Sequence, residues 1–383
     1  MPICQRSRPR SRCGSPGRIL PRMIRPFASL GSSPSGDRLQ RILRSPNYRD
    51  GAFQNPVPGG LDAMWPTIAT LQRQFFGKER RRPPAPIPIV PLARKDFESS
   101  PASGLRVTWL GHATTLIEID GFRVLVDPVW CDRASPSQLI GPERFHAPPI
   151  ALQDLPALDV VVLTHDHYDH LDMDAVRTLA SSATQDRMQF VTALGVGAHL
   201  ESWGITSRRI SELDWTDTAH VGEMRIIAAP ARHYSGRMLE RNQTLWASWV
   251  IAGPRHRVFH SGDTGFFAGI SLVGEKYGPF DLSMIKVGAY GEDWPDIHLN
   301  PEEAVRVHES IGGGLLLPIH WGTFNLAFHS WDEPVDRLVA AAEHAANTQL
   351  VVPRPGQSIE PSSPPSLTTW WRRLMPAQAS QRP

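Results

Sequence analysis

The sequence has few cysteines, almost no lysine and no long apolar run. Its three cysteines are too few for a disulfide framework, so a reducing cytoplasm is the expected compartment. No window approaches the roughly 18 consecutive apolar residues of a membrane-spanning helix. A formal net charge of +2 over 383 residues gives no general reason to expect nucleic-acid binding. We therefore expect a cytoplasmic protein without a nucleic-acid partner, with peripheral membrane association left open.

Arginine carries nearly all the positive charge, because lysine occurs only at positions 78, 95, 276 and 286. This bias is typical of a GC-rich bacterial genome. Seven arginines and no acidic residue lie within the first thirty positions. We interpret that stretch as a disordered basic arm, or as residues upstream of a true start at Met23, with a targeting peptide as the alternative. It lacks the continuous apolar core of a secretory signal.

Composition divides the chain into four segments. Residues 1–60 are rich in proline, serine and arginine, which predicts a partly disordered N-terminal arm. Residues 61–104 are predicted to pack on the main domain as an amphipathic helix over 61–76 followed by a proline-rich linker. A membrane-facing or lid role for that helix is the alternative. The main domain is expected over 105–360, and a disordered tail over 361–383.

From about residue 105, short β-branched runs alternate with helical stretches, which predicts an α/β protein with substantial sheets. The clearest helix start is at Asn300, where a capping side chain is followed by proline and two acids. Helices are predicted over 172–180, 301–311 and 333–346. Strands are predicted over 105–110, 115–119, 122–126, 160–163, 190–192, 224–228, 246–251, 257–259, 282–287 and 315–318.

The most informative feature is the hexapeptide His165-Asp-His-Tyr-Asp-His170, directly after an apolar run. Imidazoles offer lone pairs to a borderline metal, and carboxylates offset the charge of a dication. Three further loops place a ligand type where an apolar run ends, at His233, Asp263 and His320. A single zinc usually takes four ligands, so seven candidates suit two cations better than one. The seven are His165, His167, Asp169, His170, His233, Asp263 and His320.

These motifs resemble those of the metallo-β-lactamase superfamily. The hexapeptide is preceded by Trp109-Leu-Gly-His-Ala-Thr114 and Val124-Leu-Val-Asp-Pro128, and the likeness runs from about residue 45 to about 325. More narrowly, the sequence is similar to the branch of N-acylphosphatidylethanolamine-hydrolysing phospholipase D and its bacterial relatives. The resemblance implies an αββα sandwich with the metal site at one edge, between the two sheets.

The resemblance also implies a ligand assignment. It gives one zinc to His165, His167 and His233, the second to Asp169, His170 and His320, and the bridging position to Asp263. Iron or manganese would suit the same donors. By the same resemblance, a hydroxide bridging the two metals is the nucleophile, and Asp169 or Asp263 acts catalytically by orienting it.

Four more residues match positions with a role in the family, and a fifth precedes a proposed ligand. Tyr168 and His298 correspond to substrate contacts. The alternatives are structural: Tyr168 would be an aromatic packed beside the site, and His298 a residue at the entry of a helix. His112 and Asp127 correspond to positions that support the metal loop from outside. His260, just before the turn that carries Asp263, is expected to act in the same way.

The leading hypothesis is a dinuclear phosphodiesterase of phospholipase D type. It would cleave N-acylphosphatidylethanolamine-like lipids into an N-acylethanolamine and phosphatidic acid. The alternative is a lactonase or another carbonyl or phosphoester hydrolase with a small soluble substrate, and a non-catalytic protein with a vestigial site is the third hypothesis. The loop 291–296 is more acidic than expected beside an anionic headgroup, which leaves the substrate open. A homodimer is also left open.

Overall fold

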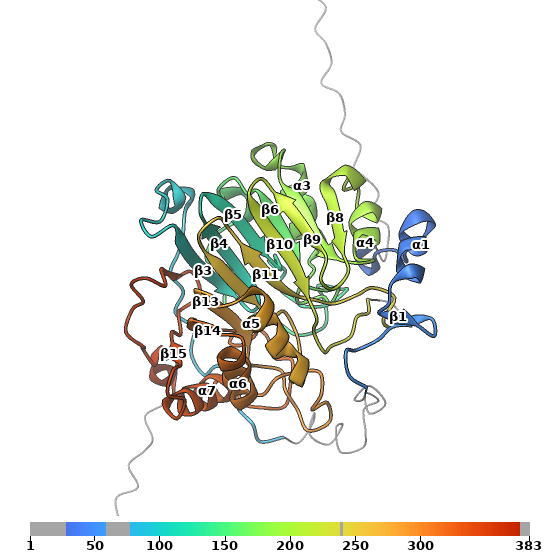
Figure 1. Cartoon of the computed structure of the whole chain (residues 1–383). Coiled ribbons are helices and arrows are strands. Elements are labelled where there is room, and N and C mark those ends of the chain that lie inside the picture. The colour runs from blue at the N-terminus through green and yellow to red at the C-terminus, as the bar shows by residue number, and fades with distance from the viewer. Residues whose placement is uncertain (1–27, 59–76, 238–239, 376–383) are drawn as a thin grey trace, which may run out of the picture.

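The computed structural model describes residues 28–58, 77–237 and 240–375. Within these ranges the chain forms two seven-stranded sheets whose buried strands share one hydrophobic core. Figure 1 shows helices α3 (Met173–Ser181) and α4 (Gly197–Ser202) beside one sheet, and α5 (Ser271–Tyr277), α6 (Pro301–Ser310) and α7 (Glu333–Glu343) beside the other. The architecture is the predicted αββα sandwich, the metallo-β-lactamase fold.

The first sheet combines an antiparallel and a parallel half. Strands β16, β3, β4 and β5 are antiparallel neighbours, whereas β5, β6, β7 and β8 run parallel. Val160–Leu163 is a continuous apolar run that is buried on both faces, as expected of an inner parallel strand. In spatial order the strands are β16 (Ser358–Ile359), β3 (Leu105–Gly111), β4 (Thr114–Ile119), β5 (Phe122–Val126), β6 (Val160–Leu163), β7 (Gln189–Ala193) and β8 (Ile210–Leu213).

The second sheet is built in the same way. Strands β9 to β12 are antiparallel, and β12 to β15 are parallel. Because parallel strands end at one edge, the loops after β12 and β14 open on the same side of the sheet. In spatial order the strands are β15 (Gln349–Leu350), β14 (Leu315–Ile319), β13 (Leu282–Lys286), β12 (Arg257–His260), β11 (Ser248–Ala252), β10 (Met224–Ala229) and β9 (Thr218–Val221).

Helix α6 begins as its sequence predicts. The Asn300 side chain accepts a hydrogen bond from the Glu303 backbone N–H (2.9 Å), and the Glu303 carboxylate accepts one from the Asn300 N–H (3.1 Å). Pro301 is the first helical residue. This capping box satisfies two amide groups at the helix start. Seven short 3-10 helices are also described: Ala28–Leu30, Arg94–Phe97, Leu152–Asp154, Ala183–Gln185, Ser207–Arg209, Ala268–Ile270 and Trp370–Leu374.

The described part of the N-terminal segment is ordered and packs on the domain. Helix α1 (Gly36–Arg44) buries Ile42, and the hairpin of β1 (Tyr48–Arg49) and β2 (Ala52–Phe53) buries Phe53. Residues 28–58 are thus the ordered part of the predicted arm, docked on the domain through these buried apolar side chains. The helix predicted over 61–76 and the basic residues 1–27 lie outside the described residues.

The tail differs from its prediction. Residues 361–375 are not disordered, because Trp370 and Trp371 are buried against Trp321, with ring centroids 5.6 and 5.9 Å away. Burial of two indoles outweighs the entropic cost of ordering a short proline-rich segment. None of the described helices is long and apolar enough to cross a bilayer.

Candidate metal centre

The hexapeptide loop is anchored by Asp127. Asp127 follows β5 and the loop follows β6, and these strands pair in parallel, so the carboxylate lies at the base of the loop. Its Oδ1 accepts from the Thr164 N–H (2.8 Å), and its Oδ2 accepts from the Thr164 hydroxyl (2.7 Å). The same Oδ2 lies 2.7 Å from His170 Nδ1. This contact turns the other ring nitrogen, Nε2, toward the site.

Three of the predicted ligands form one cluster. His165 Nε2 lies 2.8 Å from His167 Nδ1, and His233 Nε2 lies 3.2 Å from the same atom. His233 belongs to the loop after β10, so this cluster joins the two sheets. The Nδ1 of His233 donates to the Ile297 carbonyl oxygen (3.0 Å), which leaves the Nε2 lone pair free for a metal.

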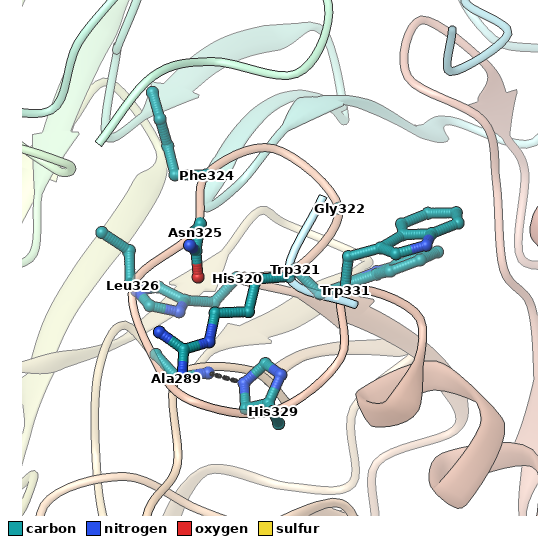
Figure 2. A pocket seen from close by; sticks show the side chains of 10 residues that line it. Ala289, His320, Trp321, Gly322, Phe324, Asn325, Leu326, His329 and Trp331 are labelled. Carbon is teal, nitrogen blue, oxygen red and sulfur yellow. Dashed lines mark hydrogen bonds between the residues drawn. The ribbon is translucent and has the colours of Figure 1, made fainter. Parts of the chain in front are cut away.

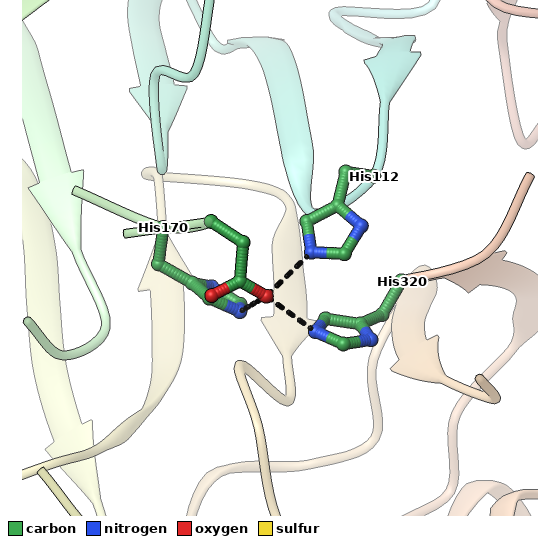
Figure 3. Close-up of side chains that lie close together, drawn as sticks. His112, His170 and His320 are labelled. Carbon is green, nitrogen blue, oxygen red and sulfur yellow. Dashed lines mark hydrogen bonds and ion pairs between the residues drawn. The ribbon is translucent and has the colours of Figure 1, made fainter. Parts of the chain in front are cut away.

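A second cluster surrounds the carboxylate of Asp169. Its Oδ2 lies 2.9 Å from His112 Nε2, 3.2 Å from His320 Nε2 and 3.5 Å from His170 Nε2. Figure 3 shows the three imidazoles converging from different parts of the chain. His320 reaches the cluster from the end of β14 with a positive φ of 63°, a backbone conformation that non-glycine residues rarely adopt. Such strained positions cluster at functional sites.

Asp263 lies between the two clusters. Its Oδ2 is 3.1 Å from His320 Nε2, 3.4 Å from His170 Nε2 and 3.7 Å from His233 Nε2. One carboxylate oxygen therefore approaches ligand atoms of both groups. The structure brings all seven predicted ligands together, and it adds His112 and His298 to the groups whose donor atoms lie within 4.8 Å of one another.

The donor atoms have the properties of a metal site. Among the described residues, several buried polar atoms of these side chains have no hydrogen-bond partner, including His170 Nε2, His320 Nε2 and Asp263 Oδ1. Buried polar atoms without a partner are rare in folded proteins, and His170 Nε2 and His320 Nε2 both lie within 3.5 Å of the carboxylate oxygens of Asp169 and Asp263. Nitrogen and carboxylate donors in this number match what divalent transition metals bind.

The protonation states also suit metal binding. Burial lowers the pKa of His233 to about 3 and that of His165 well below its ordinary value, so both imidazoles are neutral. Burial alone would raise the pKa of Asp169 and Asp263, but the adjacent histidines outweigh it and hold both carboxyls ionised. Burial opposes charge on His170 as well, yet three nearby carboxylates raise its pKa well above the ordinary value. In the metal-free protein, a proton on His170 compensates part of the negative charge.

The remaining predicted site residues take different positions. His260 Nε2 donates to the Ala113 carbonyl oxygen (3.1 Å) and its Nδ1 accepts from the Gly262 N–H (3.1 Å), so it holds the turn before Asp263. The Tyr168 hydroxyl donates to the Arg237 carbonyl oxygen (2.8 Å). His298 Nδ1 lies 3.9 Å from Asp263 Oδ2.

Three buried polar residues beside the site were not predicted. Arg237 lies 4.0 Å from the centre of the Tyr168 ring and donates to the Asp166 and Leu171 carbonyl oxygens, both at 2.8 Å. Asp166 points away from the metal ligands and accepts from the Gly236 N–H (2.8 Å). Lys286 is fully buried, and burial lowers its pKa to about 7. Two of the three had a signal in the sequence: Asp166 lies within the hexapeptide, and Lys286 is a lone lysine in an apolar strand.

In the described part of the chain, hollows adjoin the metal cluster. A small one beside His320, shown in Figure 2, has room for about one water molecule. It is crossed by a hydrogen bond from the Ala289 N–H to His329 Nε2 (2.9 Å). A larger cavity of about 490 Å³ is bounded by His298 and by residues of α6 and α7. Substrate-sized space is therefore present on the His298 side of the cluster.

Comparisons with known proteins agree with this geometry. The model of the β-lactamase superfamily domain matches residues 122–321. An uncharacterized protein of Mycobacterium tuberculosis is 50% identical over 341 residues, which cover 86% of this chain and 88% of that protein. The N-acyl-phosphatidylethanolamine-hydrolyzing phospholipase D 1 of Caenorhabditis elegans is 38% identical over 333 residues, covering 81% of this chain and 92% of the relative.

The fold is also found among solved structures. An isothiocyanate hydrolase from Delia radicum gut bacteria aligns with a TM-score of 0.54 and 21% identity over 67% of this chain and 98% of its own. At that identity the likeness concerns the fold alone. The family model and the two relatives, together with the His and Asp clusters at the sheet edge, show that this chain is a metal-dependent hydrolase of the metallo-β-lactamase superfamily, with a phospholipase D among its relatives.

Proposed function

We propose that the protein is a dinuclear zinc phosphodiesterase of phospholipase D type that acts on N-acylphosphatidylethanolamine-like phospholipids. The observation that carries the proposal is the position of Asp263, whose Oδ2 lies within 3.7 Å of ligand nitrogens from both clusters. A shared carboxylate suits two cations better than one. The phospholipase D relative at 38% identity supports the choice of a phosphodiester over a carbonyl substrate.

The proposed ligand sets follow the two clusters. One zinc would be held by three histidines, the other by two histidines and a carboxylate, with Asp263 shared. Bound dications supply Lewis-acid stabilisation of phosphoryl charge and lower the pKa of coordinated water, and iron or manganese would suit the same donors. The ligands are His165, His167 and His233 for the first metal, and Asp169, His170 and His320 for the second.

The other residues of the site position these groups or meet the substrate. Asp169 and Asp263 are held ionised, so they are fit to orient an attacking water. Asp127 fixes the tautomer of His170 through its 2.7 Å contact, and His112 supports Asp169. His298 lines the large cavity and is proposed to contact the substrate.

Purified, metal-loaded protein assayed on three substrates tests this function. We expect turnover of N-acylphosphatidylethanolamine in vesicles and of bis(p-nitrophenyl) phosphate, and loss of both activities in Asp263→Asn. The matched control is Asp154→Asn, which changes an exposed carboxylate outside the cluster. Hydrolysis of a lactone with no turnover of either diester would replace the proposal with the carbonyl-hydrolase alternative.

A further inference from the structure

Asn55, just after β2, forms two hydrogen bonds with the main chain of His233. The His233 N–H donates to Asn55 Oδ1 (2.8 Å), and Asn55 Nδ2 donates to the His233 carbonyl oxygen (2.9 Å). The two residues are 178 positions apart in sequence. His233 is completely buried, so leaving these two main-chain groups unpaired would be costly. One amide side chain therefore satisfies both groups, as a neighbouring strand would.

His233 is the ligand of its cluster that the hexapeptide loop does not carry. The other two ligands belong to that loop, which Asp127 anchors at its base. His233 lies between β10 and β11, on the other sheet. Its imidazole is fixed by the bond from Nδ1 to the Ile297 carbonyl oxygen (3.0 Å), and its main chain is fixed by Asn55. The place of its Nε2, 3.2 Å from His167 Nδ1, follows from these two constraints together.

The segment that carries Asn55 is docked by other contacts as well. The Phe53 side chain is buried, and the Phe53 N–H donates to the Asn242 carbonyl oxygen (2.9 Å). Farther back in the segment, Asn47 Nδ2 donates to Asp214 Oδ1 (2.7 Å). These contacts do not involve the Asn55 side chain. A substitution of Asn55 therefore tests one link to the metal cluster, and not the docking of the whole segment.

The same segment also reaches the hexapeptide loop. The Ser32 N–H donates to His199 Nδ1 (3.1 Å), and His199 Nε2 lies 3.3 Å from Asp166 Oδ2. Asp166 stands between two of the first metal's ligands in the sequence. The segment 28–58 is thus linked to both loops that supply this metal's histidines, to one through Asn55 and to the other through His199.

We propose that Asn55 is a positioning residue of the first metal site, and that residues 28–58 complete that site. The inference rests on the dinuclear centre of the proposed function and adds a residue from outside its ligand set. By fixing the main chain of His233, Asn55 keeps the Nε2 atom directed at the cluster. We expect its effect at the first metal, because the second is held by ligands from other loops: Asp169, His170 and His320.

Titration of chelator-treated protein with cobalt(II) tests this role. Cobalt accepts the same imidazole and carboxylate donors, and its visible absorption reports the geometry of its ligands. We expect the native protein to bind two cobalt ions. Asn55→Leu, close in size but without either hydrogen bond, should bind one of them roughly 10- to 100-fold more weakly and with an altered absorption spectrum. The other ion should bind as in the native protein.

Two further variants accompany this titration. Asn47→Leu is the matched control, because it is the same substitution in the same segment and removes only the contact with Asp214. It should bind both ions like the native protein. Asn55→Asp keeps the acceptor for the His233 N–H but sets an oxygen against the His233 carbonyl, so it should weaken the same ion as Asn55→Leu.

Binding of both ions at native affinity by the two Asn55 variants would overturn the inference. So would an equal loss in Asn47→Leu, or an equal weakening of both ions in Asn55→Leu, because either result would assign the effect to docking of the segment. Each of these results leaves the dinuclear function standing. A native protein that binds fewer than two cobalt ions would remove that function, and with it the site that Asn55 is proposed to position.

Discussion

Asp127 Oδ2 lies 2.7 Å from His170 Nδ1, and both side chains are completely buried. The contact keeps a proton on Nδ1 of His170, so Nε2, which faces Asp169 and Asp263, is the atom that would bind a metal. Asp127 itself has a positive φ of 43°, so the chain adopts an uncommon conformation to place this carboxylate. The ligand property of His170 thus depends on a residue from a neighbouring strand.

Asp127→Asn should weaken metal binding without removing the fold. An amide nitrogen facing His170 Nδ1 would act as a donor, so the imidazole proton would move to Nε2 and occupy the lone pair. We expect metal affinity to fall about 10- to 100-fold, the usual effect of removing such a partner. Metal content after dialysis against a competing chelator measures the change. Unaltered affinity, with Asp154→Asn as the exposed control, would contradict the proposed role.

Removal of metal should lower thermal stability. A cation that binds only the folded state stabilises it by RT ln(1 + [L]/Kd), about 2.7 kcal/mol at a hundredfold excess over Kd. The ionised Asp169 and Asp263 would otherwise repel each other across the cluster. Calorimetry measures Tm in three states of the protein: with zinc, after chelation and after zinc is added back. We expect Tm to fall on chelation and to recover when zinc is added back. For Asp263→Asn, which removes the shared ligand, we expect chelation to leave Tm unchanged. The same result in the native protein would mean that the site does not bind the metal.

Sequence patterns predicted the site better than the support around it. Loops after apolar runs located His233, Asp263 and His320, because strand ends in such a fold share an edge. Arg237 gave no comparable signal. Its guanidinium donates to carbonyl oxygens of residues about seventy positions away in sequence. Those contacts exist only once the loops are packed.

Tyr168→Phe distinguishes two roles for this tyrosine. As a substrate contact, its hydroxyl would affect KM. In the structure that hydroxyl donates to the Arg237 carbonyl oxygen at 2.8 Å, which favours a structural role. We therefore expect KM for bis(p-nitrophenyl) phosphate to stay within about twofold, and the free energy of unfolding to fall by about 1 kcal/mol. A several-fold rise in KM at unchanged stability would restore the substrate role.

Asp120 makes a pH-dependent link between the sheets. It lies in the β4–β5 turn and accepts from the Arg255 N–H (2.7 Å) and the His256 N–H (2.9 Å) in the β11–β12 turn. Burial alone would raise the pKa of Asp120, but these hydrogen bonds outweigh it and lower the pKa below its unfolded value. The resulting stabilisation is present above the unfolded pKa of about 3.9 and is lost as pH falls through the lower folded pKa.

Asp120→Asn should therefore cost stability mainly at neutral pH. We expect a loss of roughly 1–3 kcal/mol at pH 7, since a charged acceptor with several donors is replaced by a neutral one. The difference from the native protein should shrink in urea unfolding series as pH drops below about 4. Glu223→Gln, an exposed carboxylate in the β9–β10 turn, should show no such convergence. A pH-independent difference would mean that the carboxylate charge is not involved.

Periodicity predicted the inner elements and missed the outer ones. The predicted run 160–163 is β6 itself, and 301–311 differs from α6 by one residue. Strands β8 and β9 are at the sheet edges, where their side chains are half-exposed, and they lack a clear apolar pattern. Their formation depends on pairing with β7 and β10 rather than on their own composition.

The C-terminal tryptophans give the last prediction. Trp371 is fully buried, and its Nε1 donates to Asp336 Oδ1 (2.9 Å). Its ring centroid is 5.9 Å from that of Trp321, the residue after His320, which is stacked on Trp109 at 5.6 Å. The tail thus supports the loop that carries a proposed metal ligand.

Trp371→Ala should cost roughly 3–5 kcal/mol in urea unfolding, the range for truncating a buried large aromatic. Because Trp321 would lose packing on one side, zinc affinity should fall as well. Trp371→Phe keeps most of the apolar volume and loses only the hydrogen bond to Asp336, so it should cost less and leave zinc affinity near that of the native protein. If both variants bind zinc like the native protein, while Trp371→Ala is destabilised, the tail stabilises the fold without positioning His320.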